Sequence, residues 1–320
     1  CRQIAPFSPK RLIILDIYEN NAYYIQQELI RKYGGELNLS VEIASVRDRA
    51  KLDIIFNKYR PDIVIHAAAH KHVPLMENNP DEAVKNNIFG TYNTAFMSDK
   101  YGVKKFVLIS TDKAVNPTNL MGASKRFCEM ILNSFADSKT SYSAVRFGNV
   151  LGTNGSVIPL FKQQIAEGGP VTLTDKRITR FFMTGEEATQ LVLTCGAMAA
   201  RNQVFVLDMG EPVKIVTMAE NLIRLSGFEP YTDIPIVEIG LRPGEKLYEE
   251  LLMQTAELDS TENKKIFVEQ QKAIPMEVLE GRLAELKNAI DNALSNEEII
   301  LLMKKMVPTY KSPGEVNSAI

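Results

Sequence analysis

The residues best suited to chemistry fall within one short segment, Ser110 to Arg126, which reads S-T-D-K-A-V-N-P-T-N-L-M-G-A-S-K-R. Thr111, Asp112 and Lys113 directly follow an apolar run that is typical of a buried strand. Ligands of open α/β sheets bind beyond the carboxyl ends of the strands, so we expect these side chains to face a ligand. A carboxyl beside an amine is the pair that acid–base chemistry requires. The alternative, a turn with a solvated Asp–Lys pair, fits single residues better than the whole string.

The same segment places Met121 and Lys125 four positions apart, at the start of a predicted helix. Residues with this spacing share one helix face, so both are expected to point the same way. The alternative for Met121 is an ordinary core position.

Two acids follow other predicted strands. Asp16 ends the run R-L-I-I-L-D, where it is expected to accept bonds from ribose hydroxyls, which favours NAD over its phosphorylated form. The alternative is a solvated acid that opens a turn. Asp48 is placed to reach the adenine edge or, equally, to cap the helix that begins near Ala50.

The segment His66 to Glu77, H-A-A-A-H-K-H-V-P-L-M-E, follows another buried run. Its small residues allow a loop to approach a flat cofactor closely, so we expect cofactor contacts from the residues His66, Ala67, Ala68 and His70. All three histidines of the chain lie here, but no Cys or carboxylate has ligand spacing with them. A cofactor-flanking loop is therefore predicted, and no metal site.

The elements that must position these residues alternate between strands and helices. This rhythm predicts the α/β class, with a doubly wound, parallel, Rossmann-like sheet covered on both faces. The predicted strands are Arg11–Asp16, Val41–Val46, Asp62–Ala69, Lys105–Thr111 and Ser141–Val150. The predicted helices are Asn20–Tyr33, Ala50–Tyr59, Asp81–Tyr101 and Gly122–Phe135.

One element of such a sheet is absent from the sequence. No G-x-G-x-x-G loop, which would place a helix N-terminus against a pyrophosphate, occurs in the chain. Cys1 to Phe7 reads as the end of the first helix, and Arg11–Asp16 as the second strand. Since the usual strand order is 3-2-1-4-5-6, a gap is predicted between the strands at Arg11 and Asp62. The chain starts at Cys1 rather than Met, so we expect a segment upstream, with room for a membrane anchor.

From about Gly152 the rhythm changes to shorter strands. We predict an incomplete NAD-binding core over residues 1–150, a substrate lobe over 151–260 with some return to the core, and a helical tail over 261–320. The tail contains one charged amphipathic stretch, Met276 to Met306, which is expected to pack or to form a dimer surface.

Composition narrows the class of protein. The 320 residues are 45% apolar and 24% charged with a net charge of -2, which gives no support for a nucleic-acid or anionic-membrane partner. Three cysteines without metal spacing suit a reducing compartment, which predicts a cytoplasmic location. No apolar run is long enough to span a bilayer.

The Ser110–Arg126 string closely resembles the capsular-polysaccharide biosynthesis family of UDP-N-acetylglucosamine 4,6-dehydratases. These are extended short-chain dehydrogenases, and some members carry Met where the others carry Tyr. The resemblance extends over nearly the whole chain, except that family members have the glycine loop and many have upstream transmembrane helices. It includes L-I-I-L-D, H-A-A-A-H-K-H-V-P, N-N-I-F-G-T (Asn86–Thr91), R-F-G-N-V-L-G (Arg146–Gly152), G-S-V-I-P (Gly155–Pro159), I-T-R-F-F-M-T (Ile178–Thr184) and L-R-P-G-E-K-L (Leu241–Leu247).

The resemblance implies an NAD-dependent lyase of bacterial polysaccharide biosynthesis. The family reaction oxidises the sugar at C4, eliminates water across C5 and C6, and returns the hydride to C6. By resemblance Lys113 is the base and Asp112 the acid, while Lys125 holds the cofactor ribose. Met121 cannot take a proton, so Thr111 is expected to bond the C4 hydroxyl, with Lys125 or water as the proton path.

The resemblance also implies where the UDP-sugar binds. Substrate contacts are expected from Lys71, Asn149, Arg180, Arg242 and Glu245, with the arginines on the diphosphate and Glu245 on the uridine ribose. The alternative for Arg180 and Arg242 is a surface or interlobe ion pair. A homo-oligomer is expected.

Two rival functions remain open at this stage. A nucleotide-sugar epimerase of the same fold would keep both binding sites but needs no acid–base pair at C5 and C6. A non-catalytic assembly module is the second, because a sheet without its central strand exposes strand edges that associate.

Overall fold

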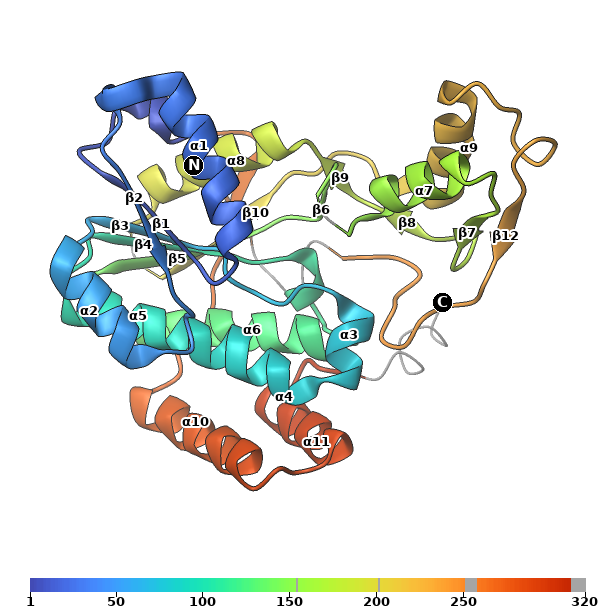
Figure 1. The fold of residues 1–320 in the computed structure, drawn as a ribbon. Coiled ribbons are helices and arrows are strands. Elements are labelled where there is room, and N and C mark those ends of the chain that lie inside the picture. Colours follow the sequence, from blue (N-terminus) through green and yellow to red (C-terminus); the bar gives the residue numbers. More distant parts are fainter. Residues whose placement is uncertain (154, 201, 251–257, 312–320) are drawn as a thin grey trace.

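The computed structural model describes residues 1–153, 155–200, 202–250 and 258–311. The protein has a large lobe built on a sheet and a smaller lobe that projects to one side (Figure 1). No helix in these described ranges is long and apolar enough to cross a membrane.

The core of the large lobe is a six-stranded sheet with the order β13-β14-β10-β5-β4-β3. The strands β3, β4, β5 and β10 are parallel, and β14 and β13 continue the sheet antiparallel. Apolar, β-branched residues fill these strands because both faces of the sheet are covered. The α/β class and the Rossmann-like sheet are thus confirmed. The strands are β3 (Ile63–His66), β4 (Lys105–Ile109), β5 (Ser141–Arg146), β10 (Gln203–Leu207), β13 (Leu258–Ser260) and β14 (Ile266–Glu269).

Helices cover the sheet in layers. Helices α5 (Gly90–Lys100) and α6 (Leu120–Ser134) pack on one face, and α8 (Gly185–Met198) packs on the other (Figure 1). Helices α10 (Met276–Asp291) and α11 (Asn296–Met306) form a further layer beyond α6. Because α6 is sandwiched between the sheet and these helices, almost all of its residues are buried.

The predicted gap beside the sheet is confirmed. Strands β1 (Leu12–Asp16) and β2 (Leu39–Ile43) form a separate parallel pair, and no described strand joins β1 to β3. Helix α1 (Glu19–Tyr33) follows β1 in the chain, and α2 (Arg49–Tyr59) follows β2. The inner edge of β3 therefore lacks a backbone partner within the described residues, and Ile63 on it is 60% exposed.

The small lobe has its own apolar core. Helices α7 (Val157–Ala166) and α9 (Ile215–Leu225) pack against the parallel pair β7 (Val171–Leu173) and β12 (Ile236–Glu238). Two short ladders connect it to the sheet, β6 (Asn149–Val150) with β9 (Phe182–Met183) and β8 (Thr179–Arg180) with β11 (Val213–Lys214).

Several predicted boundaries differ from the structure. The stretch Cys1–Phe7 contains only a 3-10 turn, Ala5–Phe7. The predicted helix Asp81–Tyr101 is divided into α4 (Pro80–Ala83), a π-helical turn (Val84–Phe89) and α5.

Two other stretches, each predicted as one element, are divided. The strand Ser141–Val150 breaks at Gly148, where a β-carbon would lie 3.0 Å from that of Phe181. The tail Met276–Met306 forms two helices because Ala293 adopts a left-handed φ of 51° between them. Ile266–Glu269, placed at the start of the helical tail, forms β14 of the core sheet.

A buried ion network fixes α6 against the sheet. Arg146 of β5, which is 0% exposed, donates to Glu129 of α6 at 2.7 Å through both Nε and Nη2, and to Glu269 of β14 at 2.7 Å. Ser110, directly after β4, donates its hydroxyl to Glu129 at 2.7 Å. Burial alone would raise the pKa of Glu129, but Arg146 outweighs it and holds the pKa at about 2. Three elements therefore meet at one carboxylate.

We expect Glu129→Gln to destabilise the fold by about 3–5 kcal/mol, because it leaves the buried Arg146 without its main counter-charge. Urea unfolding followed by circular dichroism measures this. Asp291→Asn, which breaks the exposed pair with Lys287, is the control and should change the midpoint little. If both variants lost the same free energy of unfolding, the buried network would contribute no more to stability than an exposed ion pair.

Candidate active site

The Thr111–Lys113 segment leaves the sheet at the carboxyl end of β4. The strand ladder ends with the Ser110 amide donating to Val145, and the Asp112 amide donates to the Phe147 carbonyl at 3.1 Å. A 3-10 turn, Asp112–Ala114, then bends the chain. Adjacent side chains of a straight strand would point to opposite faces, so this bend is what brings Asp112 and Lys113 together.

The Asp112 carboxyl and the Lys113 amine are in direct contact. Lys113 Nζ donates to Asp112 Oδ1 at 3.0 Å, and the Thr111 hydroxyl donates to the same oxygen at 2.8 Å. The other oxygen, Asp112 Oδ2, is buried without a hydrogen-bond partner among the described residues. Since buried carboxyl oxygens are nearly always paired, Oδ2 is the atom with capacity left for a substrate hydroxyl.

Lys113 has two more acceptors from other elements. Its Nζ lies 3.4 Å from Asn149 Oδ1 of β6 and 3.7 Å from Glu249 Oε1 in the loop 241–250. Burial by itself would lower the pKa of Lys113, but Asp112 and Glu249 outweigh that effect and the net pKa is raised. The resting amine is therefore charged and shared between acidic and amide partners.

A close backbone approach sets the position of this turn. A β-carbon on Gly122, in the first turn of α6, would lie 2.2 Å from the Lys113 carbonyl oxygen, so only glycine fits there. Asn119 caps α6 by accepting from the Gly122 amide at 2.7 Å, and its Nδ2 donates to the Gly244 carbonyl at 3.1 Å. The α6 N-terminus thus touches both the Asp112–Ala114 turn and the loop 241–250.

Met121 and Lys125 both lie on α6 and are buried, at 4% and 5% exposure. Burial lowers the pKa of Lys125, although Cys128 and Glu129 act against that. No hydrogen bond or ion pair joins the Lys125 amine to another residue of the described chain, so the amine is available to a ligand. The Met121 thioether can supply no proton.

The loop after β3 is anchored by buried polar groups. His66 is 4% exposed, contacts Thr91 Oγ1 at 3.0 Å, and has its pKa lowered by burial to about 3. Its ring is thus a neutral core group rather than a surface ligand. Ala67 and Ala68 are exposed beyond it. His70 contacts Arg47 Nη2 at 3.1 Å through its ring.

Asn87 joins this loop to α6. Its side chain accepts from the His70 amide at 2.8 Å and donates to the His70 carbonyl at 3.0 Å and to Ser124 Oγ at 2.9 Å. It lies in the π-helical turn, a feature that is frequent at functional sites. Sequence reasoning assigned it no role, although the N-N-I-F-G-T motif contains it.

Asp16 and Asp48 lie after β1 and β2. The Asp16 carboxylate accepts from the Tyr18 amide at 2.9 Å and is only partly buried. Asp48 accepts from the Lys51 amide at 2.9 Å and caps α2, so the capping role that the sequence left open is present. Asp16 is the last residue of β1, and Asp48 follows β2 by five residues.

Arg180 forms ion pairs, which is the alternative that the sequence left open for it beside diphosphate binding. Its guanidinium donates to the Thr179, Lys246 and Leu247 carbonyls at 2.8, 2.8 and 3.1 Å. It also lies 3.6 Å from Glu245 and 3.6 Å from Glu249. With these contacts and 8% exposure, Arg180 holds the loop 241–250 in place.

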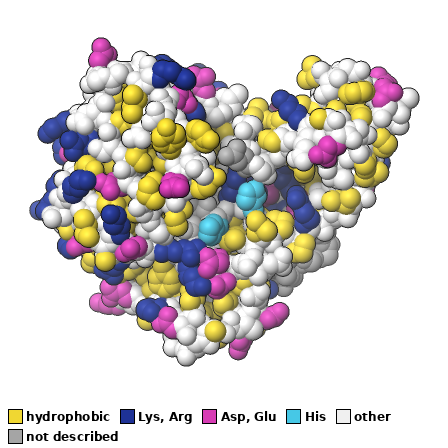
Figure 2. Space-filling view, in the orientation of Figure 1, with side chains coloured by type: hydrophobic (Ala, Val, Ile, Leu, Met, Phe, Trp, Pro, Cys, Tyr) yellow, Lys and Arg dark blue, Asp and Glu magenta, His cyan; other side chains and the backbone are white. Residues whose placement is uncertain are grey.

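Basic and imidazole groups collect where the lobes meet. Figure 2 shows histidine side chains and dark-blue basic side chains in the hollow between the lobes. Lys71 donates to Thr153 at 3.3 Å, and burial lowers its pKa. Arg242 pairs with Glu245 at 3.4 Å but keeps 53% of its side chain exposed. The His72 ring packs against Gly155, where a β-carbon would lie 2.7 Å from it. This mouth has the charge and the space for an anionic ligand.

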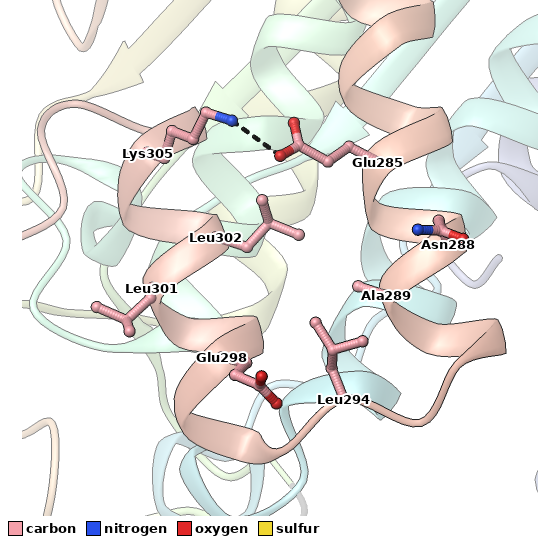
Figure 3. Close-up of a pocket in the computed structure, with 8 residues that line it drawn as sticks. All are labelled: Glu285, Asn288, Ala289, Leu294, Glu298, Leu301, Leu302 and Lys305. Carbon is pink, nitrogen blue, oxygen red and sulfur yellow. Dashed lines mark hydrogen bonds and ion pairs between the residues drawn. The ribbon is translucent and has the colours of Figure 1, made fainter.

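A second concavity lies elsewhere, between α10 and α11. Figure 3 shows that its apolar floor includes Leu294 and Leu302 and that the ion pair Glu285–Lys305 spans one end. None of the candidate site residues lines it. Within the described ranges, no group of His, Cys, Asp or Glu side chains could hold a metal.

The structure therefore brings Thr111, Asp112, Lys113 and Asn149 into one cluster and adds Glu249, which the sequence did not single out. A charge-rich stretch, E-K-L-Y-E-E, was the only sequence signal for Glu249. Acidic residues of that kind are usually solvated, and only the docking of the loop shows that Glu249 is buried.

We expect Gly122→Ala to destabilise the protein by about 1–3 kcal/mol, because the new methyl must push the Lys113 carbonyl away. Gly281→Ala, at an exposed position of α10 with open space around it, is the matched control and should stabilise by about 0.5–1 kcal/mol. Thermal and urea unfolding of both variants measure the difference. A Gly122→Ala variant as stable as the parent, or one stabilised like Gly281→Ala, would contradict the close approach.

Comparison with known proteins agrees with this architecture. A family model described as "Polysaccharide biosynthesis protein" matches residues 1–271. The probable polysaccharide biosynthesis protein EpsC of Bacillus subtilis is 57% identical over 253 residues, which are 79% of this chain and 42% of EpsC. The chain thus spans less than half the length of that relative.

Two further proteins are similar. UDP-N-acetylglucosamine 4,6-dehydratase (inverting) of Campylobacter jejuni is 40% identical over 212 residues, 65% of this chain and 60% of that enzyme. The solved structure of Pen from Bacillus thuringiensis matches with a TM-score of 0.76 and 32% identity, over 89% of this chain and 92% of Pen. The family model covers most of the sequence, and the structural match to Pen covers 89% of the chain. The chain therefore belongs to the polysaccharide biosynthesis protein family.

Proposed function

We propose that this chain carries the active site of a nucleotide-sugar 4,6-dehydratase that acts on UDP-N-acetylglucosamine or a close relative. The observation that carries the proposal is the Asp112–Lys113 contact with its free Oδ2, at the carboxyl edge of a Rossmann-like sheet. The similarity to the Campylobacter jejuni dehydratase supports the same reaction class.

The two side chains divide the elimination between them. Lys113 Nζ, once neutral, takes the C5 proton of a 4-keto sugar, and the electron pair moves into the C5–C6 bond as C6–O breaks. Asp112, protonated, gives its proton to the departing C6 hydroxyl, which leaves as water. The Lys113 amine donates to Asp112 at 3.0 Å, so transfer of that proton from amine to carboxyl would set both groups in their reactive forms together.

Thr111 and Lys125 are the groups that can serve the C4 hydroxyl. Met121, at the position from which a tyrosine would act, offers no proton acceptor. The Lys125 amine is buried and without a partner in the described residues, and burial lowers its pKa, which eases proton release. Thr111 Oγ1 hydrogen bonds to Asp112 Oδ1, so a C4 hydroxyl near it would join the same network.

The residues present fit NAD at two of its parts. Asp16 lies at the end of β1 for the adenosine ribose, with Asp48 beyond it, and the exposed loop at Ala67 and Ala68 with Lys125 suits the nicotinamide half. The chain contains no glycine loop for the pyrophosphate. A bound nicotinamide would supply hydride acceptance from C4 and return to C6, and His70 would border it through its anchored backbone.

The mouth between the lobes is proposed to bind the UDP portion. Lys71 and Arg242 are exposed cations there and are proposed to bind the diphosphate side of the ligand. Asn149, which accepts from Lys113 at 3.4 Å, is proposed to contact the substrate, and Glu245 is proposed for the uridine ribose. Arg180 is proposed to act by holding the loop that presents Arg242 and Glu245.

Incubation of the chain with UDP-N-acetylglucosamine and NAD should give a product that has lost one water, a 4-keto-6-deoxy sugar, without accumulating NADH. Asp112→Asn and Lys113→Met should each lower the rate by about 10²–10⁴-fold. Lys104→Met, which removes an exposed lysine, is the control and should keep the rate. Mass spectrometry and NMR of the sugar are the measurements.

Other products would contradict the proposal in distinct ways. A C4 epimer without loss of water would establish the epimerase instead. Dehydration that survives Lys113→Met and Asp112→Asn would remove both residues from the chemistry. No product, with NAD and UDP both bound by the chain, would exclude this sugar as the substrate.

Asp16→Ala should weaken NAD binding, because the ribose hydroxyls lose their acceptor, by about 1.5–3 kcal/mol for hydrogen bonds to a charged group. Glu19→Ala, an exposed acid one turn further along, should leave binding unchanged. Saturation-transfer NMR with NAD measures both, and equal binding to the two variants would remove Asp16 from the cofactor site.

A further inference from the structure

The loop 241–250 delivers one carboxylate into the catalytic cluster. The Glu249 side chain is 5% exposed, although the loop itself has no regular secondary structure. Arg180 binds the Lys246 and Leu247 carbonyls of this loop, and the side chains of Thr118 and Asn119 bind Gly244. Glu249 is therefore held from both lobes rather than free to swing into solvent.

Glu249 Oε1 lies between two cations. It is 3.7 Å from Lys113 Nζ and 3.6 Å from Arg180 Nε. Lys113 in turn has Asp112 on one side, at 3.0 Å, and Glu249 on the other. Its amine is thus drawn toward the loop 241–250 as well as toward its neighbour in the chain.

We propose that Glu249 is a positioning residue that holds the Lys113 amine in the site and sets how readily that amine gives up its proton. The proposal rests on the proposed function for its catalytic meaning, but the contact itself is tested without turnover. Glu249 touches no reacting atom in this scheme and acts through Lys113 alone.

The charges around Glu249 decide the direction of its effect. Facing it are Lys113, Arg180 and Asp112, and, more distantly, Lys246, whose Nζ donates to the Val115 carbonyl and lies 3.9 Å from Glu250. Lys113, Arg180, Asp112 and Glu249 together balance two positive and two negative charges. Neutralising Glu249 leaves an excess positive charge beside Lys113, which favours loss of its proton.

The charge of Glu249 affects the proposed reaction through the protonation of Lys113. A base must be neutral, and an anionic Glu249 keeps Lys113 charged to higher pH. Burial raises the pKa of Glu249 itself, so protonation of this carboxyl as the pH falls weakens its hold on the amine. Glu249 therefore holds Nζ in a fixed position beside Asp112, but it also keeps a larger fraction of the Lys113 amine protonated at a given pH.

The test compares Glu249→Gln with Glu250→Gln, its neighbour in the same loop, which bonds Asn116 and does not contact Lys113. The pH dependence of amine labelling at Lys113, read by peptide mass spectrometry on the folded chain, gives the pKa of that amine. Glu249→Gln should lower it by about one unit or more, as expected for loss of a carboxylate within 4–6 Å. Glu250→Gln should leave it near the parent value.

Glu249→Asp separates charge from structure. It keeps the anion, so the pKa of Lys113 should stay closer to the parent than in Glu249→Gln. All profiles are taken below the thermal midpoint of each variant, so reduced stability does not mask the result. An unchanged Lys113 profile in Glu249→Gln, or equal shifts in the Gln and Asp variants, overturns the proposal.

Where the parent chain turns over, the acidic limb of kcat/KM should move to lower pH in Glu249→Gln and remain in place in Glu250→Gln. A purely structural role would lower the rate at every pH without moving the limb. A chain that shows the labelling shift but makes no 4-keto-6-deoxy sugar sustains the contact and refutes the dehydratase. A chain that makes the sugar without any shift refutes the role of Glu249 alone.

Discussion

The buried salt bridge between Arg146 and Glu129 fixes the relative positions of the strands and the helix on which the candidate site is built. Two charges withdrawn from water are tolerated only when they meet each other and their remaining hydrogen bonds are made. Here Glu129 also takes the hydroxyl of Ser110, so β4, β5, β14 and α6 are fixed relative to one another at the point where β4 ends. The Thr111–Lys113 segment begins at the residue after Ser110.

From that fixed point, the site is assembled by close backbone approaches rather than by side-chain packing alone. Gly122 lets α6 touch the Lys113 carbonyl, and Asn119 links the same helix end to Gly244. The loop 241–250 is thereby held beside the Asp112–Ala114 turn and supplies Glu249. A substrate that entered between the lobes would meet elements already joined by hydrogen bonds, and Asp112 Oδ2 is one of the buried atoms that lack a partner among the described residues.

The ion pair at Lys113 and the proposed reaction make opposite demands on the charge of this amine. Lys113 is held charged by two carboxylates, whereas the proposed elimination needs its amine neutral and Asp112 protonated. Internal proton transfer along the 3.0 Å contact reconciles the two, since it changes no net charge. Lys125 differs, because burial lowers its pKa and no described carboxylate pairs with it.

The sequence pattern predicts the parallel sheet, its missing neighbouring strand and the place of the Thr111–Lys113 segment at a strand end. Continuous apolar runs separated by helices predict a parallel sheet covered on both faces, and the usual strand order of such sheets, together with the absent glycine loop, predicts the gap beside β3. The packed molecule adds what the pattern did not predict: His66 is a core group, Arg180 binds the backbone of a loop, Asn87 and Gly122 position the site, and Glu249 joins it. Those facts depend on contacts between residues that are distant along the chain, and burial, which sets their charge and pairing, is a property of the packed molecule that no local pattern specifies.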